Sequence, residues 1–164
     1  MLRKSILLAI AVMAVSAVAA APALAQKPGA HIVGDLTITK TTSGLTVSGK
    51  GAGFGNRVTT AFLTAERVEA VFQCRNPGGN IAPGQGVEMA EVVGPVTTIE
   101  PRGGHIDFSA MLPAPPAPDP ADVCPNPNWT VDPVPLSLTF FGVALHFQQN
   151  GQEVLTVPLG DIDP

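Results

Sequence analysis

Apolar and polar residues alternate with a period of two along much of the chain after residue 30. In HIVGDLTITK, Leu36 and Ile38 alternate with threonines, and in the later LTVSGKG, Leu45 and Val47 alternate with polar residues. Successive side chains of a β-strand point to opposite faces, so each stretch predicts a strand with one apolar face. The intervening TTSG is typical of a turn, and the three segments together predict a β-hairpin.

Later segments repeat this pattern. The stretch GVEMAEVVGPVTTIE predicts one long strand or two short strands, broken at Gly94-Pro95. LSLTFFGVALHFQ and EVLTVPL, joined by QNGQ, predict a C-terminal hairpin. HIDFSAML predicts a strand whose apolar side carries Ile106, Phe108, Ala110 and Leu112.

The segment RVTTAFLTAERVEAVFQC, residues 57–74, fits two periods. A pair of strands would have a common face made of Val68, Ala70, Phe72 and Cys74. A helix would have an apolar stripe made of Ala61, Ala65, Val68 and Phe72. The β-branched and aromatic residues and the strand-like neighbours favour the strands, with the helix as the alternative.

Proline and glycine interrupt the chain every few residues, which leaves little room for long helices. Residues 113–135 carry nine prolines and predict an extended surface connection rather than an interior strand. Seven to nine short strands with regular turns predict an all-β fold, an antiparallel β-sandwich of immunoglobulin-like general architecture. The order of the strands stays open, because the only tryptophan, Trp129, does not lie between the two cysteines.

The N-terminus has the features of a secretory signal peptide. Arg3 and Lys4 precede an apolar run, and Ala23-Leu24-Ala25 fits the small-x-small cleavage rule. We therefore expect a signal peptide over residues 1–25 and a single domain over residues 26–164 that is secreted, extracellular or in the cell envelope. A retained membrane anchor is the alternative, and contact with the membrane is otherwise expected only through the signal before cleavage.

The charge of the expected mature chain excludes one class of partner. Removal of Arg3 and Lys4 leaves 7 basic and 13 acidic residues, a net charge of −6. Nucleic acids and anionic membrane surfaces reward basic patches, and the basic residues of this chain stand singly. We expect no nucleic-acid partner and an unidentified extracellular or envelope ligand.

Cys74 and Cys124 are the only cysteines of the chain. Two lone cysteines of an exported protein most often pair, so we expect a structural disulfide with its Cys74 sulfur pointing inward. Free thiols are one alternative. A metal site is another, but the spacing lacks a C-x-x-C or a nearby histidine pair, and we expect neither a metal nor a cofactor.

Each cysteine begins a Cys-x-Asn-Pro motif, CRNP and CPNP. Asparagine before proline favours extended backbone, and its side chain can cap nearby backbone groups, so each motif predicts a rigid turn beside the bridge. Loops 75–86 and 124–133 are the expected contact surface. Its candidate binding residues are Asn76, Asn80, Gln85, Asn126, Asn128 and Trp129, of which the tryptophan is expected to pack over the disulfide rather than stand exposed.

The combination of C-x-N-P-G-G-N-x-A-P-G-Q (Cys74 to Gln85) with C-P-N-P-x-W (Cys124 to Trp129) resembles a group of small secreted proteins of actinobacteria and other bacteria. The layout of signal peptide, Thr/Val-rich strands and C-terminal hairpin is similar too. The resemblance implies a β-rich exported protein and implies no activity. The chain departs from the group in TAERVEAV and in its longer proline-rich stretch at 113–120.

Candidate catalytic groups are present but sparse. His105, Asp107 and Ser109 would share one face of a strand, yet residues two apart lie about 6.8 Å apart along it, too far for the hydrogen bonds of a triad. We expect a polar solvent face there. The pattern does not favour three further sets: Glu88, Glu91 and Glu100 as paired carboxylates, Asp119, Asp122 and Asp132 as calcium ligands, and His31 and His146 as isolated ligands.

These observations predict a secreted, non-catalytic binding module that presents loops at one end of a crosslinked scaffold. One alternative is a structural or assembly protein of the cell surface, which an exposed apolar edge strand would favour. Another is a small extracellular hydrolase, which a pocket gathering His105 or His146 with a carboxylate from another strand would favour.

Overall fold

The computed structural model describes residues 29–163. The expected signal peptide and the first residues of the expected mature chain lie outside this range. The described part is almost entirely antiparallel β, arranged in two sheets with one disulfide, so the predicted fold class is confirmed at this level. No helix between residues 29 and 163 is long and apolar enough to cross a membrane.

The smaller sheet contains three strands in the order β1-β2-β6. Its strands are β1 (His31–Thr41), β2 (Gly44–Ala52) and β6 (Ile106–Pro113). The predicted hairpin of β1 and β2 and the predicted apolar side of β6 are confirmed. A β-bulge interrupts β1 between Val33 and Thr37, where Gly34 adopts a positive φ of 73°.

The larger sheet has the order β4-β3-β8-β9. Its main strands are β3 (Thr59–Arg75), β4 (Ile81–Val93), β8 (Ser137–Gln149) and β9 (Gln152–Ile162). Two short strands, β5 (Thr97–Ile99) and β7 (Thr130–Val131), pair with the two ends of β3. The break at Gly94-Pro95 and the C-terminal hairpin of β8 and β9 are as predicted.

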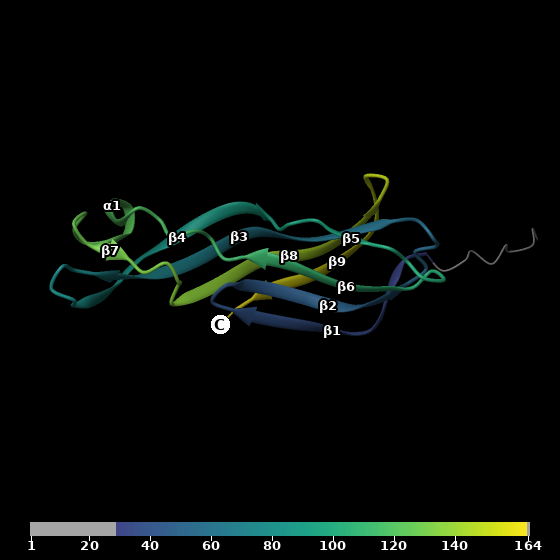
Figure 1. The fold of residues 1–164 in the computed structure, drawn as a ribbon, viewed down its shortest axis with the longest axis horizontal. Coiled ribbons are helices and arrows are strands. Elements are labelled where there is room, and N and C mark those ends of the chain that lie inside the picture. Colours follow the sequence, from purple (N-terminus) through teal and green to yellow (C-terminus); the bar gives the residue numbers. More distant parts are fainter. Residues whose placement is uncertain (1–28, 164) are drawn as a thin grey trace, which may run out of the picture.

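Residues 59–75 form one continuous strand, so the favoured β structure with its face of Val68, Ala70, Phe72 and Cys74 is confirmed. The alternative helix is wrong, and so is the division into two strands. The segment contains no glycine or proline with which to turn, and it pairs along its length with β4 and β5 on one side and with β7 and β8 on the other. Seventeen residues at about 3.4 Å each give a strand of roughly 55 Å. This strand sets the long axis of the molecule (Figure 1).

The buried face of β3 changes parity halfway along the strand. Ala61, Leu63 and Ala65 are buried at odd positions, whereas Val68, Ala70, Phe72 and Cys74 are buried at even positions. The change falls at Glu66, which the ladders place opposite Gly142 of β8 and Glu91 of β4. Both of these residues have positive φ, 58° and 51°, and β8 changes parity there as well. The strands therefore switch faces together, which keeps apolar side chains on the core side at both ends.

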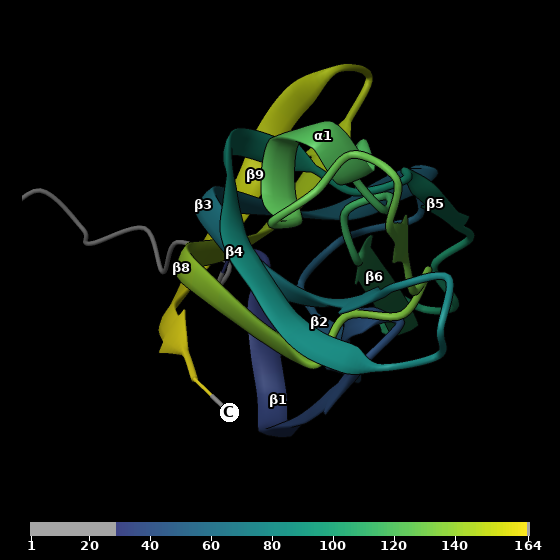
Figure 2. The same ribbon diagram turned by 90° about the vertical axis from the view of Figure 1, so that its left-hand side faces the viewer.

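Both sheets contribute to one hydrophobic core. Seen along the long axis, the strands of the two sheets surround the same interior (Figure 2). Phe147 of β8 lies at its centre and makes edge-to-face contacts with Phe108 of β6 at 4.9 Å and with Phe54 at 5.2 Å between ring centroids. A third tie is polar: Lys40 Nζ of β1 donates a 2.8 Å hydrogen bond to the carbonyl oxygen of Leu138 in β8.

The proline-rich connection, residues 113–135, runs along the surface as predicted, with two short regular pieces. These are the single helical turn α1 (Pro120–Val123) and the two-residue strand β7. Asp119 caps α1, and its Oδ1 accepts a hydrogen bond from the backbone N–H of Ala121. Together with the β3–β4 hairpin, α1 and β7 form one end of the molecule, beyond the small sheet (Figure 1).

Candidate functional site

The predicted disulfide is present between Cys74 of β3 and Cys124, just after α1. Their Cα atoms lie 5.8 Å apart across a sequence separation of 50 residues. Cys74 is fully buried, as the strand pattern predicted. The bridge fastens the proline-rich connection to the protruding half of β3, where the small sheet no longer covers the core side.

The two Cys-x-Asn-Pro motifs form similar turns. The backbone carbonyls of Asn76 and Asn126 each accept a hydrogen bond from the N–H three residues later, that of Gly79 and that of Trp129. Their side-chain Oδ1 atoms accept further bonds, from the N–H of Asn80 at 2.8 Å and of Asn128 at 2.9 Å. The predicted capping role is confirmed. It also means that the amide oxygens of Asn76 and Asn126 stabilise turns and are occupied.

The register of β3 brings the two turns into one row. Arg75 pairs with Ile81 of β4 on one side and with Thr130 of β7 on the other. One residue further, the N–H of Asn76 donates to the carbonyl of Asn80, and Trp129 directly precedes Thr130, where the β7 ladder ends. Asn80 and Trp129 therefore follow the two ladders at the same end of β3, one on each side of it.

We call Asn80, Asn128 and Trp129 the tip cluster. Asn80 and Asn128 are exposed, and Trp129 is half-buried, so its ring is neither enclosed nor fully presented. Trp129 is neither fully packed nor fully exposed; its burial is intermediate between the two alternatives. An ion pair of Arg75 with Asp132 at 3.4 Å braces the row from beneath.

Gln85 does not belong to the tip cluster. The predicted loop 75–86 is shorter than expected, because β4 already begins at Ile81. Gln85 lies in the β-bulge of β4, some 17 Å along the strand from Asn80. Pairing with the uninterrupted β3 explains the longer strand, since Pro83 and Gly84 fall at the bulge and do not break the ladder.

The carboxylates that were weighed as metal ligands or catalytic pairs have separate roles. Asp119 caps α1 and Asp132 pairs with Arg75. Glu88 lies 3.4 Å from Arg67, whose guanidinium also contacts Glu69 at 2.6 Å. Between residues 29 and 163, no group of three or more histidine, cysteine or acidic side chains gathers around a common point.

His105, Asp107 and Ser109 are all exposed on the outer face of β6, opposite its buried apolar side. The predicted solvent face is therefore confirmed. Asp107 lies 3.9 Å from Lys50 of the neighbouring strand β2, and both side chains are more than 70% exposed. Such an exposed pair contributes little to stability.

His146, which has no partner in the sequence, is the centre of a hydrogen-bond relay across three strands. Its Nδ1 lies 2.7 Å from Glu153 Oε2 of β9, and its Nε2 lies 3.0 Å from Thr64 Oγ1 of β3. A carboxylate only accepts, so Nδ1 donates, and in the neutral ring Nε2 accepts from the Thr64 hydroxyl. Phe62 stacks on the imidazole at 5.0 Å, and the His146 side chain is only 19% exposed.

The relay has two of the contacts that a nucleophilic triad needs, a hydroxyl bound to an imidazole and the imidazole bound to a carboxylate. A hollow of about 350 Å³ adjoins Thr64. Its walls include Glu66 and Glu91, however, and their negative charge opposes an oxyanion, which such a site must stabilise. We assign the relay a structural role: it fastens β9 and β3 to β8 on their outer face.

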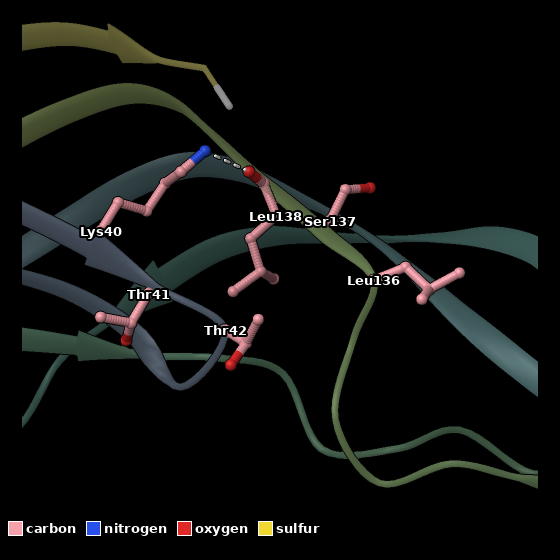
Figure 3. Close-up of a pocket in the computed structure, with 6 residues that line it drawn as sticks. All are labelled: Lys40, Thr41, Thr42, Leu136, Ser137 and Leu138. Atoms are coloured by element: carbon pink, nitrogen blue, oxygen red, sulfur yellow. Dashed lines mark hydrogen bonds between the residues drawn. The ribbon is translucent and has the colours of Figure 1, made fainter.

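A second hollow of about 240 Å³ lies where the β1–β2 turn approaches the start of β8 (Figure 3). Thr41 and Thr42 come from the turn, and Leu136, Ser137 and Leu138 come from the start of β8. Of the described residues, Lys40 is the only charged one in this lining. Its ammonium group donates a hydrogen bond to the carbonyl oxygen of Leu138 at the edge of the hollow (Figure 3). This hollow is a seam between the two sheets and gathers no acid–base pair.

The six predicted binding residues thus divide into the three residues of the tip cluster, two turn-forming asparagines and one remote glutamine. No local pattern in the sequence indicates the relay, because His146, Glu153 and Thr64 meet only through strand pairing. Comparison of the chain with protein-family models, with curated proteins and with solved structures gives no match.

Proposed function

We propose that this chain is a secreted, non-catalytic β-sandwich module that binds a polysaccharide of the cell envelope or of the extracellular surroundings through the tip cluster. The disulfide that fixes the two Asn-Pro turns side by side is the observation that carries the proposal. A sandwich is supported by the single core to which both sheets contribute. The secretory signal and the oxidised cysteine pair support export.

The chemistry of the tip cluster suits a neutral polyhydroxylated ligand. Amide side chains both donate and accept hydrogen bonds, which matches sugar hydroxyls, and Asn80 and Asn128 are exposed for this role. The indole of Trp129 offers an apolar face and one N–H donor beside them. Since Arg75 is paired with Asp132, no unpaired cation at the row favours an acidic ligand.

Rigidity adds to the affinity that such a small surface can reach. Binding costs free energy for every loop that it orders, so a surface ordered in advance binds better. Five backbone and side-chain bonds hold the two turns, and the crosslink fastens them to the sheet. The tip cluster is therefore formed before any ligand arrives.

The test is a binding screen of the mature chain against envelope and matrix polysaccharides. Asn80→Ala and Asn128→Ala remove only side-chain amides, because the backbone N–H groups make the turn bonds. Gln152→Ala, an exposed amide at the far β8–β9 turn, is the matched control. We expect binding that both tip variants weaken and the control leaves unchanged. Absence of binding to every polysaccharide, or equal loss in the control, would reject the proposal.

One observation favours a second function, assembly between copies or with other surface proteins. Strand β1 is an edge of the small sheet, and Val33 and Ile38 on it are 45% and 44% exposed. The bulge at Gly34 interrupts the ladder that a partner strand would need, which makes assembly the weaker candidate. Light scattering measures the oligomeric state. A chain that is monomeric at high concentration, and that stays monomeric when its polysaccharide is added, would reject the assembly function.

A further inference from the structure

Two histidines lie beside the small sheet: His31 begins β1, and His105 directly precedes β6. These strand ends lie at the end of the molecule opposite to α1 and β7 (Figure 1). His31 of β1 pairs with Ala52 of β2, and Ile106 of β6 pairs with Gly51. Continuing the second ladder by one residue places His105 on the other side of Ala52. Because residues directly opposite in a ladder share a face, both imidazoles lie on the outer face with only the alanine methyl between them.

Both histidines line one hollow of about 740 Å³. Apart from their rings and Asn56, its walls consist of Ala52 and glycines of three segments. The walls thus offer peptide groups and no acidic side chain or bulky apolar one. Among residues 29–163, the two imidazoles are the only titratable groups that line the space.

The rim of this hollow is held in place. Gly103 and Gly104, with φ of 59° and 82°, form a two-residue hairpin turn that sets His105 at the rim. The N–H of Phe54 donates to the carbonyl of Gly104, which joins the two glycine-rich loops. Gln149 Nε2 in turn donates to the carbonyl of Phe54 at 2.7 Å.

The hydrogen bonds of the rings leave nitrogens available on the hollow. His31 Nδ1 lies 2.9 Å from the carbonyl oxygen of Gly29, and because a carbonyl only accepts, Nδ1 carries the proton and Nε2 keeps its lone pair. Metal-binding histidines are held in this way, with the other nitrogen bound to a carbonyl or carboxylate. Within residues 29–163 the ring of His105 has no hydrogen-bond partner, whereas both nitrogens of His146 are engaged.

We propose that His31 and His105 together bind one divalent transition-metal ion, Cu²⁺ in preference to Zn²⁺, with water completing its coordination. Imidazole nitrogen suits these ions, and the general order of affinities places Cu²⁺ above Zn²⁺. Two nitrogens at about 2.0–2.1 Å from one ion lie roughly 3–4 Å apart. The Cα atoms of two residues that lie two strand spacings apart are separated by about 9.5 Å. Their imidazole nitrogens can come within about 3–4 Å of each other if both side chains turn toward Ala52.

Two carboxylates and one guanidinium lie near the histidines. Glu100, Arg102 and Asp107 line an adjacent hollow of about 270 Å³ that His105 also borders, so the nearby side chains carry two negative charges and one positive charge. Because two protein ligands are fewer than the four of a structural zinc site, the ion exchanges with the solvent and does not support the fold. The site is independent of the polysaccharide-binding function, since the tip cluster lies at the other end of the molecule.

The test uses the mature chain without an affinity tag, titrated with CuCl₂ and ZnCl₂ by calorimetry. The variants are His31→Gln and His105→Gln, with His146→Gln as the matched control because its nitrogens are already bound. We expect one ion per chain, and a loss of affinity of more than about tenfold in each of the first two variants, the least that even an outer partner contributes. His146→Gln should bind as the parent does.

Electron paramagnetic resonance of the Cu²⁺ complex gives the second readout. Hyperfine splitting from two imidazole nitrogens is expected in the parent chain and from one in either variant. Both variants alter exposed side chains, and a thermal melt confirms their folding. No saturable binding, binding that only one of the two variants weakens, or equal weakening by His146→Gln would each overturn the shared site.

Discussion

Glu66 of β3 lies directly over Gly142 of β8, so closely that a Cβ on the glycine would fall 2.5 Å from the Glu66 carboxyl carbon. Gly142 also has a φ of 58°, and its N–H donates to Asp161 Oδ1 at 2.8 Å. This contact lies at the row where the buried positions of β3 and β8 change between odd and even residue numbers. Glycine is favoured there by the left-handed backbone, whereas the close neighbour is the flexible end of the exposed Glu66 side chain and can move aside.

Gly142→Ala should therefore destabilise the fold. The left-handed conformation costs a residue with a Cβ about 1–2 kcal/mol, and Glu66 must also move aside. Urea unfolding measures the loss. In Glu66→Ala, where the steric part is already removed, the same substitution should cost less but still about 1 kcal/mol. An unchanged unfolding midpoint in Gly142→Ala would contradict the role assigned to this row.

Glu91→Gly, in contrast to Gly142→Ala, should stabilise the fold. Glu91 occupies the same row on β4 with a φ of 51°, a conformation that glycine adopts without cost. The expected gain is up to about 1 kcal/mol, reduced by the greater freedom of glycine in the unfolded chain. Glu88→Gly is the matched control, because it places glycine on the same strand at a residue without positive φ, and it should destabilise.

Removal of the disulfide should cost much of the stability of the domain. A bridge across 50 residues constrains the unfolded chain by roughly 4 kcal/mol in the loop-entropy account. Unfolding of the Cys74→Ala/Cys124→Ala double variant, compared with the oxidised parent, measures the difference. Alkylation without reductant, followed by intact mass, checks the pairing itself: two modified thiols in freshly exported protein would contradict it.

The His146 relay should make stability depend on acidic pH. Hydrogen bonding from Thr156 and from His146, aided by the attraction of the imidazole, lowers the pKa of Glu153 below its ordinary value. A lowered folded-state pKa stabilises the fold above the unfolded-state pKa, and that contribution disappears as the pH falls through the folded value. The ordinary pKa of glutamate is about 4.3, so the loss occurs below this pH.

Glu153→Gln isolates this contribution. Urea unfolding of parent and variant should show the parent more stable at pH 7, with the difference closing toward pH 3 as the parent carboxylate becomes protonated. Gln152→Ala on the adjacent residue is the control and should show no such convergence. A difference that stays constant between pH 7 and pH 3 would mean that the Glu153 charge does not stabilise the relay.

Local patterns in the sequence predicted the features that depend on neighbouring residues. Alternation identified β1, β2, β6, β8 and β9, the lone cysteine pair of an exported chain indicated the bridge, and the Asn-Pro motifs indicated its turns. The segment around Glu66 was misread because its alternation breaks at the parity change. Each half then resembles a separate short strand, and the irregular spacing also fits a helix. Only pairing with β4 and β8 makes it one strand.

The candidate site shows the same division between local and distant contacts. Turn chemistry correctly gave Asn76 and Asn126 their capping roles, yet no local signal separated these asparagines from the exposed Asn80 and Asn128. The His146 relay and the His31–His105 row depend on register across three strands. Register follows from pairing partners that the sequence left open, so neither cluster was predictable.

The tip cluster offers its own reporter, because Trp129 is the only tryptophan of the chain. The most direct test of the proposed function is therefore a titration of the mature protein with soluble polysaccharide fragments, followed by intrinsic tryptophan fluorescence. We predict a saturable change in emission that Asn128→Ala weakens and Gln152→Ala leaves intact. Binding by calorimetry with no change in tryptophan emission, and with equal affinity in Asn128→Ala, would show that the ligand binds elsewhere.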